Sequence, residues 1–504
     1  GVQTCALPIY LEAMVDYNRT FGRHDVNAML LYNQDELVNN VPGNNLINSL
    51  PKRKQGLAGR LSYAYDGKYM AEVNMGYNGS ENFAKGHRWG FFPSIALGYN
   101  ISEESFFEPL RKVITSMKLR GSWGLVGNDQ IGGERFIYMP TINLSGKGFT
   151  TGIDQNYGLS GPVYTRYENN SITWEVGEKI NLGIDLQLLN SLNIVVDIFR
   201  ETRRDIFQKK GTIPTYLGTG NTDVFGNLAE MKNQGLDLSI DYNKAFSKDF
   251  YMNFKGTFTY AHNEITKYDE APKYAFQSKV GQSANVSQGY LSNGLFLDEA
   301  EIDRYNQQMG STLGAGDIKY LNVSNMHGYG DDIVDVDDWT WIGNPTVPEI
   351  VYGFGPSFKY KNWDFSFFFQ GVAKTSLFMS GFHPFGDNSL RNVLQFVAND
   401  RWSPTNQNVD AKYPRLTRKT SLNNTNPGNS GRTSDYWMRD GSFLKLKNME
   451  LGYTFKRMRF YISGSNLLTF SKFDLWDPEQ GGGSGLKYPT QRVFNVGFQM
   501  TFNN

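Results

Sequence analysis

The chain has almost no cysteine. Its 504 residues include one, Cys5, which excludes a disulfide framework and a cysteine-based metal site. There is no G-x-S-x-G nucleophile motif, and GTGNTD at 218–223 lacks the third glycine of a dinucleotide fingerprint. The five histidines show no spacing typical of metal ligands: His24, His87, His262, His327 and His383. We therefore predict that the protein is not an enzyme.

Net charge and long apolar runs are missing as well. Fifty Lys and Arg residues balance fifty Asp and Glu residues, so the chain has no electrostatic footprint for nucleic acid. No run of apolar residues reaches the length of about 18 that a transmembrane helix needs. Residues 1–9 lack the basic start and the apolar core of a signal peptide.

Strands are abundant, because apolar and polar residues alternate along most of the chain. Residues 57–65 and 69–77 both do so, and the Asp66-Gly67 pair between them is a strong signal for a tight hairpin. We count roughly fifteen such segments of about ten residues each. Further examples are 10–21, 180–188, 192–198, 236–242, 250–260, 363–370 and 493–502.

The connections between these strands alternate strictly between short and long. Short turns lie at 22–23, 66–67, 190–191, 244–249, 361–362 and 456–457, and 101–115 is a longer turn in the same position. Long connections lie at 36–53, 79–89, 127–178, 202–232, 263–348, 373–442 and 469–490. Compact soluble domains rarely carry so many long loops, whereas transmembrane β-barrels have short periplasmic turns and long extracellular loops. The sequence therefore predicts an all-β, antiparallel transmembrane β-barrel.

The two faces of the predicted strands differ as a membrane requires. Charged residues such as Arg60, Asp185 and Asp197 occupy the polar face, because an Arg facing lipid at the midplane costs about 2–4 kcal/mol. Aromatic residues gather near the short turns and predict one interfacial girdle. Its members are Tyr17, Phe21, Tyr65, Tyr69, Tyr360, Trp363, Tyr453 and Phe455.

The long loops carry the candidate site residues. Short helices are expected at 299–308 and 388–400. Loop aromatics are candidate ligand contacts, although such residues also anchor loops. They are Trp339, Trp341, Trp402, Tyr436, Trp437 and Trp476. Asp331, Asp335 and Asp337 lie in an acidic stretch that resembles a calcium loop without its regular register, and a solvated acidic turn is the alternative interpretation.

Several stretches together resemble the SusC/RagA family of TonB-dependent outer-membrane transporters. They include GFFPSIALGYNISEESFF (90–107), LRGSWGLVGND (119–129), DRWSPTNQNVDAKYPRL (400–416), SDYWMRDGSFLKLKNMELGYTF (434–455) and RVFNVGFQMTF (492–502). The resemblance spans nearly all of 10–502. It implies a plugged barrel of about 22 strands, energy from the TonB complex, and a SusD-like surface lipoprotein as lid. The family's acidic loop is interrupted here by Met326-His327-Gly328-Tyr329, which weakens the calcium assignment, so we expect no cofactor.

The resemblance also bears on the ends of the chain. Residues 1–9 resemble translated sequencing-adapter DNA, so Cys5 is expected to be non-native. Residues 10–504 would then be the C-terminal part of the barrel, with about 15 of the 22 strands. The signal peptide, the plug and the first strands would lie upstream. An unusual natural N-terminus is the alternative.

The functional hypothesis is active import of a nutrient across the bacterial outer membrane. The resemblance implies an oligosaccharide as cargo, or an oligopeptide in the RagA branch. A passive porin-type channel and a secreted β-rich glycan-binding protein remain as alternatives. A plug and a TonB box in the upstream sequence would indicate a transporter and not a passive channel. A requirement for detergent would exclude the secreted protein.

Overall fold

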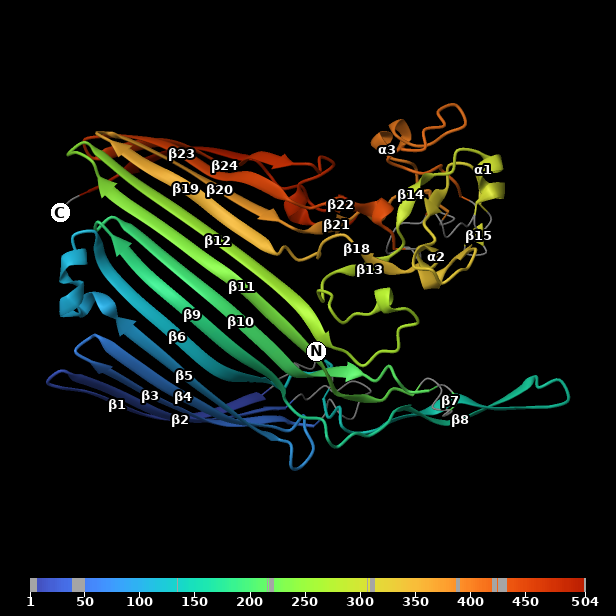
Figure 1. Cartoon of the computed structure of the whole chain (residues 1–504), viewed down its shortest axis with the longest axis horizontal. Helices are drawn as coiled ribbons and strands as arrows, with labels where there is room; N and C mark the ends of the chain where they lie inside the picture. The colour runs from blue at the N-terminus through green and yellow to red at the C-terminus, as the bar shows by residue number, and fades with distance from the viewer. Residues whose placement is uncertain are drawn as a thin grey trace, which may run out of the picture. The chain divides into compact units, whose positions relative to one another are not determined.

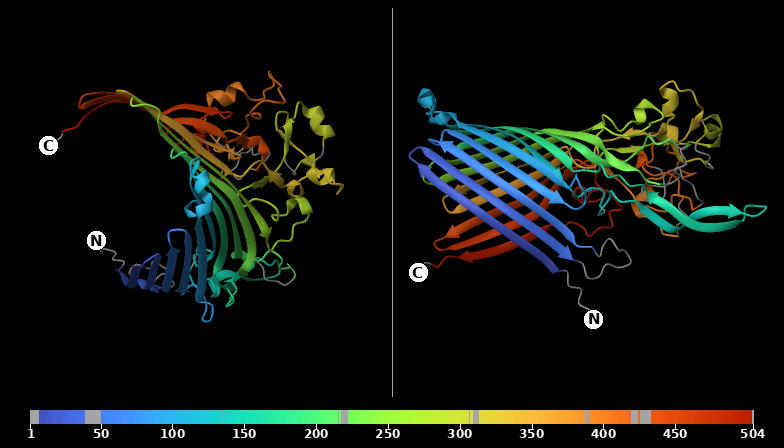
Figure 2. Two further views of the ribbon diagram at one scale, coloured as in Figure 1. Left: turned by 60° about the vertical axis from the view of Figure 1, so that its left-hand side comes forward. Right: turned by 90° about the horizontal axis from the view of Figure 1, so that it is seen from below.

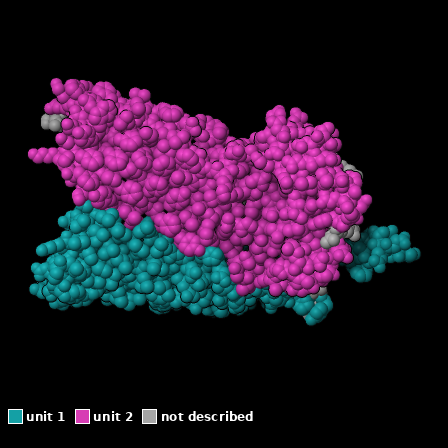
Figure 3. Space-filling view, turned by 45° about the horizontal axis from the view of Figure 1, so that its top comes forward, with its two compact units in different colours: residues 1–238, 262–271 teal, residues 239–261, 272–504 magenta. Residues whose placement is uncertain are grey.

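The computed structural model describes residues 7–38, 50–133, 135–214, 216, 222–305, 307–308, 313–386, 390–418, 424 and 433–502. The chain forms two compact units, residues 1–238 with 262–271 and residues 239–261 with 272–504 (Figure 3). Cys5 and the rest of residues 1–6 lie outside the described residues. The first strand begins at Leu7, which pairs with Val38. No helix among the described residues is long and apolar enough to cross a bilayer.

The largest sheet among the described residues is antiparallel and has 15 strands, with an unbroken sequential order apart from elements inserted in loops (Figure 1). Figure 2 shows strands β1–β5, in blue, running side by side. In sheet order the strands are β1 (Leu7–Phe21), β2 (His24–Val38), β3 (Lys52–Tyr65), β4 (Tyr69–Ser80), β5 (Trp89–Asn100), β6 (Ile114–Asn128), β9 (Glu175–Leu188), β10 (Leu192–Lys209), β11 (Phe225–Ala245), β12 (Phe250–Lys267), β19 (Ile350–Tyr360), β20 (Trp363–Ala373), β23 (Phe443–Phe455), β24 (Met458–Ser471) and β25 (Val493–Met500).

The predicted alternation of short and long connections is confirmed. Short turns occupy 22–23, 66–68, 101–113, 189–191, 246–249, 361–362 and 456–457. Longer connections occupy 39–51, 81–88, 129–174, 210–224, 268–349, 374–442 and 472–492. The turn after β3 has positive φ at both Asp66 (54°) and Gly67 (64°), the backbone of the tight hairpin turn that this pair predicts.

The connections between the strands of this sheet contain the remaining elements. Two short helices confirm the predicted helical segments in shorter form, α1 (Glu299–Arg304) and α3 (Gln395–Asn399). The others are η2 (Ile101–Glu103) and η3 (Ser105–Leu110) in the longest of the short turns, and then β7 (Thr141–Thr151), β8 (Tyr157–Arg166), η5 (Ala275–Gln277), β13 (Ser287–Gly289), β14 (Ser292–Leu295), β15 (Gln307–Gln308), β16 (Ile318–Tyr320), α2 (Val323–Met326), β17 (Ile333–Val334), η6 (Val336–Asp338), β18 (Thr340–Ile342), β21 (Ser376–Phe378), η7 (Asp435–Trp437), β22 (Met438–Asp440) and η8 (Pro478–Gln480).

The two faces of strand β9 have opposite character. Leu182 is 62% exposed and pairs with Ile198 of β10, which is 59% exposed. On the opposite face Arg120 of β6 binds two carboxylates, with its Nη2 at 2.8 Å from Asp185 Oδ1 and 3.0 Å from Asp197 Oδ2. An exposed apolar face backed by a charged face is what a wall between lipid and water requires.

Exposed aromatic rings mark the short-turn ends of the strands, as the girdle prediction requires. Trp363 and Tyr453 lie 4.7 Å apart between ring centroids, and Tyr69 stacks on Tyr99 at 5.1 Å. Tyr17, Phe21, Tyr69, Tyr360, Trp363 and Phe455 are exposed. Such amphipathic rings suit the level of the lipid headgroups.

Candidate functional site

Three long connections of the second unit fold into one packed body, which we call the loop body: residues 272–349, 374–442 and 472–492. Its core is aromatic and aliphatic. The buried members include Tyr290, Leu295, Ile318, Tyr320, Met379, Phe382, Phe385, Trp402, Tyr413, Trp437 and Phe473. Side chains from all three connections contribute, so the loop body has a hydrophobic core of its own.

A buried ion pair joins the first connection to the second. Asp317 is fully buried, and Arg415 donates to both of its carboxylate oxygens, at 3.0 Å from Nη2 to Oδ2. Asn424 Nδ2 and the Gly314 amide also donate to it, at 2.6 and 3.0 Å. The hydrogen bond to Asp317 raises the pKa of Arg415 above its usual value. The pair therefore holds together segments about a hundred residues apart in sequence.

A second buried cation fixes the third connection. The side chain of Lys445, on β23, is 1% exposed and pairs with Asp477 and with Glu479, the latter at 2.8 Å from Nζ to Oε2. Lys447 also contacts Glu479 at 2.8 Å. Burial alone would raise the pKa values of both carboxyls, but the hydrogen bonds that they accept, chiefly from Lys445, lower them below their usual range.

Acid should release this third connection. Because the folded-state pKa values of Asp477 and Glu479 are lowered, their contribution to stability is complete above about pH 5 and is lost as the pH falls through the lowered values. We expect the rate of amide hydrogen exchange in 481–487, corrected for its intrinsic pH dependence, to rise about tenfold as the pH falls from 7 to 3. This corresponds to a loss of about 1.4 kcal/mol in the free energy of opening. Lys445→Met should flatten this dependence, and equal pH dependence in both proteins would contradict the assignment.

Two of the predicted ligand contacts lie inside the core of the loop body. Trp437 is 0% and Trp402 5% exposed, and Trp437 packs against Phe382 and Phe385 with centroids 6.4 and 5.2 Å apart. Neither indole presents a free face to a ligand in this arrangement. Their burial favours a packing role.

Three other predicted contacts are half-buried and anchor the backbone through their polar tips. Trp341 Nε1 donates to the Ser278 carbonyl at 2.8 Å. Tyr436 Oη donates to the Ala411 carbonyl at 2.8 Å. Trp476 Nε1 donates to the Gly481 carbonyl at 2.9 Å. Trp339, by contrast, is 37% exposed and meets the ring of Tyr290 edge-on at 5.9 Å between centroids, so it remains a candidate ligand contact.

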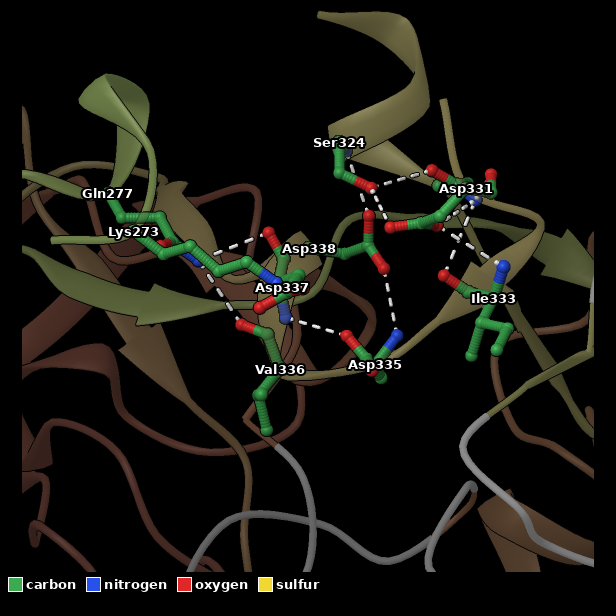
Figure 4. Close-up of polar contacts among 10 residues, drawn as sticks. Lys273, Gln277, Ser324, Asp331, Ile333, Asp335, Val336, Asp337 and Asp338 are labelled. Atoms are coloured by element: carbon green, nitrogen blue, oxygen red, sulfur yellow. Dashed lines mark hydrogen bonds and ion pairs between the residues drawn. The ribbon is translucent and has the colours of Figure 1, made fainter. Parts of the chain in front are cut away.

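The acidic stretch is held by hydrogen bonds within the chain (Figure 4). Asp331 accepts from the Ile333 amide at 3.2 Å, from Asn322 Nδ2 at 3.1 Å and from Ser324 Oγ at 3.1 Å. Burial alone would raise the pKa of Asp331, but these hydrogen bonds lower it below its usual value. Its two oxygens are therefore committed to donors of the same chain.

The neighbouring carboxylates are committed in the same way. Asp335 Oδ1 accepts from the Asp337 amide at 2.8 Å and caps the helix η6, while Asp337 pairs with Lys273. Asp338 is fully buried and accepts from the amides of Ser324 and Asp335 at 2.9 and 2.8 Å, and burial raises its pKa. No three acidic, histidine or cysteine side chains converge as metal ligands within the described ranges. The carboxylates of the stretch thus serve hydrogen bonds and one ion pair within the chain, and the calcium assignment stays a prediction.

Four rings that the sequence interpretation missed form an aromatic cluster, in which Tyr274 and Phe276 are half-buried and His327 and Tyr329 are exposed. Tyr274 lies 5.5 Å from Phe276 and 4.2 Å from Tyr329 between ring centroids, and Phe276 stacks on His327 at 4.7 Å. Tyr329 is 50% exposed. Lys273 lies 5.2 Å from the Tyr274 ring and pairs with Asp337, so charged groups border the rings. The only sequence signal was aromatic spacing at two residues, in 274–276 and 327–329.

Comparison with known proteins agrees with this architecture. The family model described as TonB dependent receptor-like, beta-barrel matches residues 7–467, and the chain belongs to that family. TonB-dependent receptor P3 of Formosa agariphila is 25% identical over 551 residues, covering 97% of this chain and 52% of the relative. TonB-dependent receptor SusC of Bacteroides thetaiotaomicron is 28% identical over 471 residues, covering 88% of this chain and 43% of the relative.

A solved structure of the RagAB peptide transporter superposes with a TM-score of 0.71 at 20% identity, covering 99% of this chain and 56% of that chain. The chain spans about half the length of the curated relatives it matches. The predicted SusC/RagA resemblance and the outer-membrane location are confirmed, and this location excludes the secreted alternative. Members of this family are transporters and not enzymes.

Proposed function

We propose that the protein imports an oligosaccharide through the outer membrane, with energy from the TonB complex and a SusD-like lipoprotein covering the long loops. Family membership supports the transport class. The observation that carries the choice of cargo is the partly exposed aromatic cluster of Tyr274, Phe276, His327 and Tyr329.

Sugars suit such a surface because their C–H faces pack on aromatic rings while their hydroxyls need polar partners at the edge. Lys273 and Asp337 supply a donor and an acceptor beside the rings, and the exposed Trp339 extends the aromatic surface of the loop body. A neutral cargo also matches a chain without net charge. The oligopeptide alternative rests on the RagAB peptide transporter, whose likeness to this chain establishes the fold alone.

Growth and binding together test the proposal. A deletion strain should fail to grow on particular oligosaccharides, and removal of TonB should abolish that growth as well. The double variant Tyr274→Ala, Tyr329→Ala should bind the same sugar at least about tenfold more weakly, the equivalent of about 1.4 kcal/mol. Tyr488→Ala removes another exposed loop tyrosine, in the 472–492 connection, and should leave binding unchanged.

Three results would contradict the proposal. A growth defect on peptides alone would favour the oligopeptide cargo. Uptake that persists without TonB would favour a passive channel. Equal loss of sugar binding in the double variant and in Tyr488→Ala would show that the aromatic cluster is not part of the cargo site.

A further inference from the structure

Exposed cations lie at three consecutive short turns of the second unit. These turns join β11 to β12, β19 to β20 and β23 to β24, which follow one another in the sheet (Figure 1). Asp249 is the only acidic residue within turns 246–249, 361–362 and 456–457. The exposed cations, which we call the basic rim, are Lys244, Lys248, Lys361, Lys456 and Arg457.

Each of the three turns places one lysine against an exposed aromatic ring. The distances from Nζ to the ring centroid are 5.5 Å for Lys244 and Phe246, 5.6 Å for Lys361 and Tyr360, and 5.6 Å for Lys456 and Phe455. An ammonium group at this distance is attracted by the face of the ring. Because the aromatic rings of a girdle lie at the level of the lipid headgroups, the lysines are held at that level as well.

The backbone of two turns shows that lysine is not the residue the turn itself favours. Lys361 and Lys456 have positive φ angles of 51° and 55°. Glycine and asparagine are the usual residues in this region, and residues with long side chains are uncommon there. Lysine at both positions therefore points to a role of the side chain.

Backbone hydrogen bonds between neighbouring turns fix the spacing of the basic rim. The Lys361 amide donates to the Asp249 carbonyl at 2.7 Å, and the Thr454 amide donates to the Asn362 carbonyl at 2.8 Å. Neighbouring strands lie about 4.8 Å apart, so the six strands of these three hairpins span roughly 24 Å of the sheet. The cations thus form an ordered row.

The cations of the basic rim differ from other short-turn cations in having no carboxylate partner in the described part of the chain. In the first unit, three cations at short turns each form an ion pair. The pairs are Arg23 with Asp66 at 3.7 Å, Lys68 with Glu104 at 3.6 Å, and Arg111 with Glu103 at 3.9 Å. The basic rim therefore presents positive charge that the chain itself does not neutralise.

We propose that the basic rim binds the phosphate groups of anionic phospholipids in the periplasmic leaflet of the outer membrane. Short turns of a transmembrane barrel lie on the periplasmic side, where the outer membrane carries phospholipids. Clusters of lysine and arginine at a membrane surface attract anionic headgroups. This inference depends on the outer-membrane location and is independent of the cargo.

Continuity with the apolar face of the sheet favours lipid over a periplasmic protein. Tyr360 lies on the same face of β19 as the exposed Phe354, and Phe455 lies on the same face of β23 as the exposed Met449. A phospholipid can cover this apolar row with its acyl chains while its phosphate reaches the lysine beyond the ring. A protein in the periplasm would meet only the turns.

Photo-crosslinking to lipid tests the proposal at one residue. A photoreactive phenylalanine analogue is placed at Asn362, in the middle turn of the basic rim, or at Asn190 as control, which is exposed in the uncharged turn 189–191. The full-length protein is reconstituted in vesicles of equal parts phosphatidylglycerol and phosphatidylcholine. We expect the ratio of phosphatidylglycerol to phosphatidylcholine adducts to be at least about threefold higher at position 362 than at position 190. Equal ratios, or no lipid adduct at 362, would overturn the proposal.

Two triple variants with the same loss of charge separate the basic rim from net charge. Lys361→Gln, Lys456→Gln, Arg457→Gln should lower the ratio at 362 to that at 190. The control Arg23→Gln, Lys68→Gln, Arg111→Gln removes the cations that have carboxylate partners and should leave the ratio unchanged. An unchanged ratio in the first variant, or an equal fall in both, would contradict the assignment.

Two further measurements do not depend on the folding of the first variant. Lys361→Arg, Lys456→Arg keeps both charges and should keep the preference for phosphatidylglycerol. In the protein labelled at 362 and otherwise unaltered, about 1 M salt shortens the Debye length to about 3 Å and should remove the preference. A preference that survives salt, or adducts of position 362 with a periplasmic protein in place of phospholipid in intact outer membranes, would show that the basic rim does not bind lipid phosphate.

Discussion

Arg415→Met should lower the free energy of opening of the loop body by about 3–5 kcal/mol, because it leaves the fully buried Asp317 carboxylate without its cation. Asn424 and the Gly314 amide would still donate to that carboxylate but would not neutralise it. Hydrogen exchange of the amides in 314–320 measures the opening directly, since the Ile318 and Tyr320 amides are hydrogen-bonded within the buried core.

A matched control lies in the same connection. Lys412 and Asp400 form an exposed ion pair at 3.7 Å, with side chains 67% and 41% exposed, and Lys412→Met should cost less than about 1 kcal/mol. The double variant Asp317→Asn, Arg415→Met also removes the buried carboxylate charge that Arg415→Met leaves unpaired. It should therefore recover part of the lost free energy of opening. Equal exchange in Arg415→Met and Lys412→Met would show that the buried pair does not hold the loop body together.

The second large effect concerns the outer face of the sheet. Leu182→Arg should destabilise the membrane-inserted protein by about 2–4 kcal/mol, because a guanidinium then faces hydrocarbon near the middle of β9. Asn181→Arg places the same charge one residue away on the opposite face, next to Ser122 of β6, and should be tolerated. Reversible unfolding in lipid vesicles measures both variants.

The contrast between the two variants is more informative than either value alone. Because their side chains point to opposite sides of the same strand at nearly the same depth, differences in backbone propensity and in membrane position largely cancel. Destabilisation of both variants by the same amount would mean that the two faces meet similar surroundings. A larger loss in Asn181→Arg would reverse the assigned orientation.

The sheet was predictable from the sequence because its rule is local. Alternation at Leu182 and Asp185 fixes which face is apolar, and a pair such as Asp66-Gly67 fixes where a strand turns back. Each signal lies within a few residues, so one sequence suffices to find strands, turns and the alternation of loop lengths.

The loops were less predictable because their order depends on distant contacts. Nothing near Trp437 distinguishes it from Trp339, yet the first is buried and the second is exposed. The difference arises from packing against Phe382 and Phe385, in the same long connection but more than fifty positions earlier. The pairing of Asp317 with Arg415 spans a longer distance in the chain and likewise has no local signal.

The β7–β8 hairpin was missed for a different reason. Its register shifts break the period of two on which strand prediction depends, and its glycines and serines are typical of irregular loops. The aromatic cluster was missed because Tyr274 and Tyr329 lie in separate segments that meet only in the folded loop body.

The transporter assignment depends on hydrocarbon lying against the Leu182 face of the sheet and water against the Asp185 face. Spin labels placed one at a time on cysteines at positions 180–187, in a Cys5→Ser background and in lipid bilayers, test this directly. Collision rates with oxygen should peak at 180, 182, 184 and 186, and collision rates with a water-soluble nickel chelate should peak at the positions between them. In-phase profiles, or oxygen maxima at 181, 183, 185 and 187, would contradict the assignment.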